Sequence, residues 1–165
     1  MEIGESFVGS GANAAHVNTV LGRRDGPVGA AWATALATPT AGHAPFVAVL
    51  QPGMPVKPFT LFVNKAQIKG NDHGRLTWGA AQAGVASGVI DAVAAGTIDA
   101  EEAPLLALIA AVWVNPEARE ADLVYANNRE ATAGALVLGR AGLPTAADVL
   151  EAREEPWNPY FRNPG

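Results

Sequence analysis

The 165-residue sequence predicts an α+β fold in which strands and helices alternate along the chain. Short apolar or alternating runs, typical of strands, recur between segments whose apolar residues have a helical period. No internal repeat and no linker divides the chain, and its length suits one domain with a core of its own. We therefore expect a single domain over residues 1–165, with a Pro- and aromatic-rich tail from about residue 154.

The first half of the chain contains most of the predicted strands. Apolar runs predict strands at residues 3–9, 15–22, 46–50 and 60–68. Pro27 suits the first turn of a helix, which we expect to reach about Ala37 with Val28, Ala31, Trp32 and Ala35 on one face. Three prolines within residues 51–58 exclude regular structure there and indicate a rigid extended loop.

The second half is predicted to be mainly helical. A long helix rich in Ala and Gly is expected from about residue 74 to 95, and its small residues would allow another element to approach closely. An acidic helical turn follows at 99–103. Residues 105–114 suit either a strand or a buried helix, and the surrounding pattern favours a strand. A last helix is expected from Glu117 to about Leu138, and the tail is expected to dock on its own domain or on a neighbour.

Composition and charge exclude several classes of protein. The net charge is −5 and the basic residues are scattered, which argues against nucleic acid as a partner. The longest apolar run is about half the roughly 20 residues of a membrane helix. With no cysteine, disulfides and thiolate metal sites are excluded. We expect a cytoplasmic protein, and the low charged fraction of 16% together with abundant small residues suggests an oligomer.

Motifs for metal, nucleotide and acyl-transfer chemistry are missing from the sequence. There is no H-x-x-x-H or H-E-x-x-H pattern, so no metal site is expected. The G-S-G turn lacks the spacing of a dinucleotide fingerprint, and no G-x-S-x-G is present. Any chemistry must therefore come from a sparser set of side chains.

His16 is the first candidate for proton transfer. Imidazole is the side chain that most readily exchanges a proton near neutral pH, and the other two histidines, His43 and His73, lie in Gly-flanked loop-like segments. A histidine in such a strand is either a structural residue or an acid–base group. Asn18 shares a strand face with His16, because strand side chains alternate.

Further polar residues lie within apolar segments. Asn64 and Lys65 are expected on opposite faces of their strand. Lys65 lies either on the solvent side of an edge strand or in a cleft, and Gln67 follows nearby. Gln82 is flanked by small residues, and in a buried position it needs hydrogen-bond partners that a polar ligand would supply.

These residues fall within blocks that resemble a known family. The blocks are G-E-x-x-V-G-x-G-x-x-x-A-H-V-N, P-x-K-P-x-T-L-x-x-N-K and W-G-A-A-Q-A-G-V-A-x-G-V-x-D-A-V-A-x-G-x-I. In this order and spacing, they resemble the formaldehyde-activating enzyme family. The resemblance runs from Ile3 to about Gly142 and fails mainly in the tail.

The resemblance implies a fold, an assembly and an activity. It implies a mixed sheet with packed helices, like the second domain of ribosomal protein S5, in a cytoplasmic homopentamer. It implies condensation of formaldehyde with tetrahydromethanopterin, a reduced pterin that serves as co-substrate, to give the methylene-pterin and water. His16 would be the general acid. The substrate-binding positions would be Asn18, Val47, Lys65, Gln67 and Gln82.

Two of these positions depart from the family pattern. The family has His-x-Asp where this chain has Asn18, and N-K-x-T where it has Gln67. A carboxylate favours the protonated form of a nearby imidazole, so Asn18 removes that support and allows the ring to reorient. Gln67 places a longer amide in the pterin pocket. Three functions stay open: the formaldehyde-condensing lyase, a paralogue that binds a pterin without turnover, and an enzyme for another amine or carbonyl compound.

Overall fold

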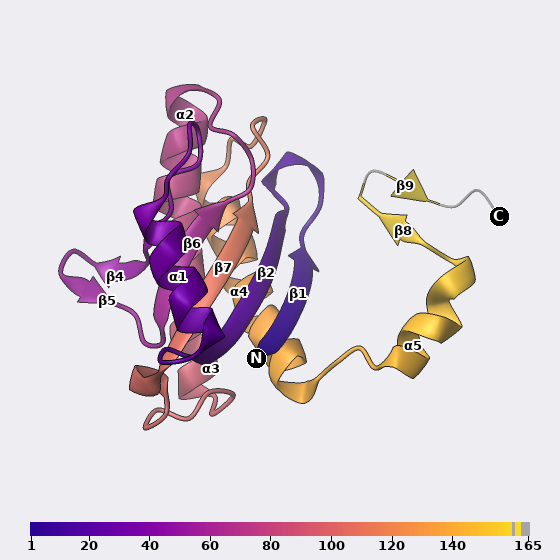
Figure 1. The fold of residues 1–165 in the computed structure, drawn as a ribbon. Helices are drawn as coiled ribbons and strands as arrows, with labels where there is room; N and C mark the ends of the chain where they lie inside the picture. Colours follow the sequence, from indigo (N-terminus) through magenta and orange to yellow (C-terminus); the bar gives the residue numbers. More distant parts are fainter. Residues whose placement is uncertain (160, 163–165) are drawn as a thin grey trace.

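The fold is a five-stranded sheet covered on one face by two long helices. The computed structural model describes residues 1–159, 161 and 162 (Figure 1). The strand order is β1-β2-β7-β6-β3. Neighbouring strands are antiparallel except for the parallel pair β6–β7, so the predicted α+β class with a mixed sheet is confirmed. The strands are β1 (Glu2–Val8), β2 (Ala15–Arg23), β7 (Leu106–Trp113), β6 (Phe59–Asn64) and β3 (Phe46–Val47).

The helices divide unequally between the two faces of the sheet. Helices α3 (Gln82–Ala94) and α4 (Ala121–Ala141) pack on one face, together with the segment α2 (Gly70–Arg75) and the π-helical turn η2 (Leu76–Ala81). On the opposite face, α1 (Pro27–Ala37) is the one long helix among the described residues, and it crosses β2 and β7 (Figure 1). Of the predicted apolar face of α1, Val28 is buried, Trp32 and Ala35 are half-buried, and Ala31 is exposed.

The hydrophobic core lies between the sheet and the α3–α4 layer. Residues 15, 17, 19 and 21 of β2 are buried against this layer, while the residues between them are half-buried on the opposite face. Strand β7 is confirmed at the segment for which the sequence allows both a strand and a buried helix. It lies in the centre of the sheet between β2 and β6, and its residues are all buried or half-buried, which explains its nearly continuous apolar sequence.

Two predicted strands are shorter than expected. The predicted strand 46–50 divides at Ala48, whose N–H donates to the Thr60 carbonyl oxygen while its own carbonyl accepts from Val56. The chain thus leaves the sheet and forms the hairpin of β4 (Val49–Gln51) and β5 (Met54–Pro55). The hairpin extends into residues 51–58, so the prediction that this segment has no regular structure is wrong. The predicted strand 60–68 ends at Asn64, because the Asn64 side-chain amide donates to the carbonyl oxygens of Gly42 and Ala66 and turns the chain away.

Helix boundaries also differ where distant residues intervene. The predicted helix at 74–95 begins at Gly70. The last long helix begins at Ala121 rather than Glu117, because the Asn13 side-chain oxygen accepts hydrogen bonds from the Arg119 and Glu120 N–H groups. It ends at Ala141, where Gly142 adopts a left-handed conformation. The predicted acidic helical turn is an irregular turn that leads into the short 3₁₀ helix η3 (Ala103–Leu105).

The tail after Gly142 forms a separate arm. It contains α5 (Ala146–Glu151), η4 (Ala152–Glu154) and a small hairpin of β8 (Trp157–Asn158) and β9 (Phe161–Arg162) (Figure 1). A reciprocal hydrogen-bonded cap between Thr145 and Asp148 begins α5, and these bonds lower the pKa of Asp148. No helix of the described part is both long and apolar enough to cross a lipid bilayer.

Small residues allow α3 and α4 to pack with their backbones almost in contact, as the sequence predicts. A Cβ atom built on Gly84 would lie 2.4 Å from the Tyr125 carbonyl oxygen, and one on Gly88 would lie 2.4 Å from that of Arg129. Across the surface of the same helix pair, Arg129 donates hydrogen bonds to Asp91 and lowers its pKa. The close approach therefore aligns α4 along the sheet.

Substituting these glycines tests the close packing. Gly84→Ala places a methyl group against backbone that cannot rotate away, so we expect the free energy of unfolding to fall by about 1–3 kcal/mol. Gly79→Ala is the matched control. Gly79 is exposed in the same helical run, and a Cβ atom added there would meet no other atom within 4 Å, so alanine is expected to be neutral or to stabilise by about 0.4–1 kcal/mol. Urea denaturation at one protomer concentration measures both, and equal stability of the two variants would contradict the packing.

Candidate active site

The open face of the sheet carries the predicted acid–base residue. His16 and Asn18 lie on β2 and point away from the core, as the alternation predicts. Across the sheet, His16 is opposite Phe7 on β1 and Trp113 on β7, and Asn18 is opposite Glu5 and Ala111. Because α1 covers only the other end of these strands, this end of the face is accessible.

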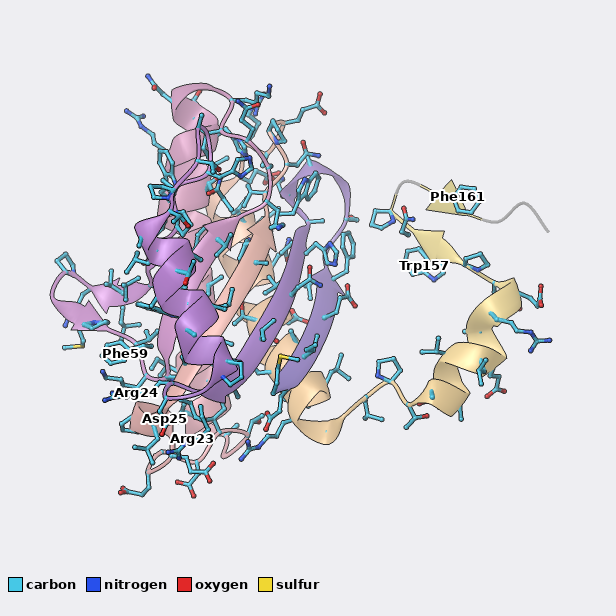
Figure 2. All side chains as sticks on the ribbon, in the orientation of Figure 1. Arg23, Arg24, Asp25, Phe59, Trp157 and Phe161 are labelled. Atoms are coloured by element: carbon cyan, nitrogen blue, oxygen red, sulfur yellow. The ribbon has the colours of Figure 1, made fainter. Side chains whose placement is uncertain are left out.

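His16 lines a cavity of about 510 Å³ on this face. The cavity also contains Asn18 and Lys65, so the structure brings together three of the six predicted site residues. The remaining lining residues come from the neighbouring strands and from the tail: Phe7, Ala111, Trp113, Asn158 and Pro159. The tail thus comes back to the sheet at the cavity, although α5 lies apart from it and Trp157 and Phe161 remain exposed (Figure 2).

The His16 ring has a carboxylate partner that sequence reasoning missed. Its Nε2 atom lies 2.8 Å from Glu5 Oε1, and its ring is tilted against Phe7 with 6.2 Å between the centroids. Glu5 belongs to the first of the family motifs, but its contact with His16 depends on the register of β1 against β2. Alternation alone would have identified Glu5 and Phe7 as residues of one strand face.

Lys65 lies at the cavity rather than at the edge of the sheet. It follows β6, which has β7 on one side and β3 on the other, and its N–H donates to the Val112 carbonyl oxygen at 2.7 Å. This backbone bond holds the start of the loop next to β7. The preceding residue, Asn64, is buried and bonded to loop carbonyls, so the two side chains differ in environment as predicted.

Val47 lines a second cavity of about 550 Å³ at the α1 end of the same face. The walls are mostly apolar and include Trp32 and Phe59, with Arg24 at the rim (Figure 2). The Trp32 Nε1 atom is buried and makes no hydrogen bond within the described part of the chain. Beside this cavity, Lys57 Nζ lies 2.9 Å from the centroid of the Phe59 ring, and burial together with the charge of Arg24 lowers the Lys57 pKa.

Gln82 and Gln67 lie in neither cavity lining. Gln82 is 7% exposed, and its side-chain amide forms two hydrogen bonds with the backbone of Val49. Its Oε1 atom accepts from the Val49 N–H at 2.8 Å, and its Nε2 atom donates to the Val49 carbonyl oxygen at 3.2 Å. The hydrogen-bond partners that the sequence required are therefore supplied by β4. Gln67 packs over Gly42, where a Cβ atom would lie 2.5 Å from Gln67 Cγ.

The other two histidines bond to backbone groups of neighbouring segments. His73 lies in α2 and not in a loop, so the prediction of a loop-like segment is wrong for this residue. His73 is 1% exposed, and its ring bonds the Lys69 N–H and the Val114 carbonyl. His43 Nδ1 lies 2.8 Å from the Asn64 carbonyl oxygen. No cluster of three or more His, Cys, Asp or Glu side chains suited to a metal ion occurs among the residues that the structure describes. His16 lines the cavity described above.

Comparison with known proteins agrees with the motifs around this site. The sequence profile of the formaldehyde-activating enzyme (Fae) family matches residues 3–161. The chain belongs to the formaldehyde-activating enzyme family. The match continues beyond Gly142, where the sequence motifs suggest that the resemblance fails, and covers most of the tail.

The relatives have two different lengths. The 5,6,7,8-tetrahydromethanopterin hydro-lyase of Methanosarcina barkeri is 40% identical over 158 residues, which cover 96% of this chain and 89% of the relative. The bifunctional enzyme Fae/Hps of Methanococcoides burtonii is 40% identical over 154 residues, and that of Archaeoglobus fulgidus 37% over 158. The chain spans 39% and 40% of these two longer proteins.

The double hydrogen bond of Gln82 predicts a structural role that can be measured without substrate. Gln82→Met keeps the side-chain length but leaves the Val49 N–H and carbonyl without their partners, so we expect a loss of about 1–3 kcal/mol of unfolding free energy. Gln51→Met is the control, because Gln51 is exposed and the same replacement there should leave stability unchanged. Chemical denaturation compares the two, and a neutral Gln82→Met would show that the bonds contribute nothing.

Proposed function

We propose that this chain catalyses the condensation of formaldehyde with tetrahydromethanopterin, forming methylene-tetrahydromethanopterin and water. The observation that carries the proposal is the cavity that unites His16, Asn18 and Lys65. Its motifs belong to a family whose member in Methanosarcina barkeri is named for this hydro-lyase reaction.

His16 is the residue that supplies the proton in this proposal. The pterin contributes two amine nitrogens, which bond in turn to the carbon of formaldehyde. The carbonyl oxygen must leave that carbon as water, and a positioned acid at this oxygen accelerates the step by about 10²–10⁴-fold. The His16 side chain is 42% exposed, so water can return a proton to the ring after each turnover.

The cavity suits a flat, polar-edged ring system. Its volume of about 510 Å³ lies within the range of small-molecule sites. Phe7 and Trp113 provide aromatic walls, and Asn18 on β2 and Lys65 directly after β6 provide hydrogen-bond donors. Formaldehyde and amines also react without a catalyst, so the protein does not need to activate either of them. The remaining acceleration comes from holding both reactants beside His16 in a reactive geometry.

We infer from the second cavity that a complete site is formed by two copies of the chain. Val47 lines that cavity, whereas His16 lies in the first, and the two share no lining residue. Ala107 and Ala111 of β7 line one cavity each, and four strand residues span about 13 Å. We propose a homo-oligomer, a pentamer as the family resemblance implies, in which the Val47 side of one copy completes the His16 cavity of the next. We place its reaction in the cytoplasm.

A second candidate function is binding of a pterin, or of another amine, with little or no turnover. It is favoured by Asn18, which has no negative charge, and by Gln67, which packs on Gly42 outside the cavity lining. Calorimetry with tetrahydromethanopterin and tetrahydrofolate distinguishes it from the first. Tight binding without any rate above the spontaneous reaction would favour the second function.

Replacing His16 tests the acid. His16→Gln keeps a polar side chain but cannot deliver a proton, so the formaldehyde-dependent rate above background is expected to fall about 10²–10⁴-fold. Absorbance at the methylene-pterin band follows the reaction, and circular dichroism confirms that the variant is folded. A His16→Gln protein with the full rate would exclude this role.

Mixing two inactive variants tests the shared site. His16→Gln disables one side, and Val47→Trp fills the cavity on the other. If sites form between copies, the two proteins are unfolded and refolded together in equal amounts, and about a quarter of the sites in a ring should become active. In such a site, the intact His16 comes from the Val47→Trp variant and the intact Val47 comes from the His16→Gln variant. Each variant refolded alone is the control. Activity of the mixture no higher than that of its parents would place the whole site within one copy.

A further inference from the structure

We propose that Glu5 is the positioning residue of His16, holding the ring by Nε2 so that Nδ1 is the atom that delivers the proton. This inference rests on the proposed function and names a residue that the sequence motifs did not assign. It starts from one contact, the 2.8 Å approach of Glu5 Oε1 to His16 Nε2.

The pairing of β1 and β2 explains why this contact forms. Glu5 is directly opposite Asn18, so it lies diagonal to His16 on the same face of the sheet. Diagonal neighbours in an antiparallel pair are within reach of long side chains. Phe7, directly opposite His16, packs against the ring from the side, which leaves the ring between an aromatic wall and a carboxylate.

Asn18 leaves Glu5 without a charged residue directly opposite it. A carboxylate at residue 18 would lie directly opposite that of Glu5, and like charges in this position repel each other. The neutral amide of Asn18 avoids that repulsion. Glu5 thereby supplies, from the neighbouring strand, the carboxylate that residue 18 lacks.

The contact contributes little to folding, which points to a role in chemistry. The two side chains are 42% and 59% exposed, and ion pairs with such access to water add little stability. What a carboxylate does to an imidazole in this position is fix the ring orientation and the tautomer. Variants of Glu5 should therefore fold normally, and their effects can be attributed to the ring.

This geometry defines the path of each proton. In the protonated ring, Nε2–H donates to Glu5 and Nδ1–H faces the departing oxygen. The carbon–oxygen bond breaks with its electron pair on oxygen, the Nδ1 proton transfers to it, and water leaves. The proton of the first amine is already on this oxygen as the hydroxyl, and the second amine releases its proton to solvent when it bonds to the carbon. The neutral ring keeps its Nε2–H bond to Glu5, and solvent returns one proton to Nδ1.

The test combines a rate measurement with a direct measurement of the ring. In ¹⁵N-labelled protein, two-bond couplings report which nitrogen of His16 carries the proton, with His16→Gln used to assign its signals. We expect one tautomer, protonated at Nε2, in the unchanged protein and a mixture of both in Glu5→Ala. The kcat of Glu5→Ala is expected to fall about tenfold or more while the KM for the pterin stays within about twofold.

Two further variants separate this role from a general effect of charge. Adding Asn18→Asp to Glu5→Ala returns a carboxylate to the same face and is expected to restore part of kcat. Glu130→Ala, on the exposed side of α4, removes the same charge elsewhere and is expected to change neither rate nor ring signals. An unchanged tautomer in Glu5→Ala would overturn the proposal. If the unchanged protein has no activity at all, the proposed function fails, and the ring signals still decide whether Glu5 holds His16.

Discussion

The contact of α4 with the sheet is the constraint on which the rest of the molecule depends. A Cβ atom on Gly4 would lie 1.8 Å from the Ala135 carbonyl oxygen, so β1 and α4 approach each other at backbone distance. Gly84 and Gly88 bring α3 equally close to α4 on its other side. This packing places both large clusters of buried apolar residues between the sheet and the α3–α4 layer. The opposite face is consequently left to α1 at one end and to the cavity of His16 at the other.

A sheet with one covered face is well suited to chemistry of this kind. The buried residues of β2 hold the strand against the core, so the alternate residues His16 and Asn18 project from a rigid surface. The reaction asks for a proton donor and for two reactants held together, and formaldehyde needs no activated nucleophile from the protein. Few polar groups are therefore sufficient, provided that their positions are well defined.

Most of the core elements could be predicted from sequence because their signals are local. The periodicity of the α3 region, the apolar run of β7 and the alternation in β2 depend on neighbouring residues only. Where the prediction was wrong, a distant residue decided the outcome. Asn13 sets the start of α4 from the loop before β2, and the pairing of Ala48 with Val56 divides the predicted strand at 46–50. No local pattern contains that information.

In the site, too, local sequence patterns predicted some features, and contacts between distant residues decided the others. By itself, the sequence determined that His16 and Asn18 share a strand face and that an acid without metal or thiol partners is the available chemistry, because alternation and composition are local properties. Only the tertiary structure decided that Glu5 contacts His16, that Lys65 joins the same cavity and that Gln82 binds β4 instead. Each of these contacts joins residues brought together by strand register or helix packing, and such contacts exist only once the core has aligned the strands.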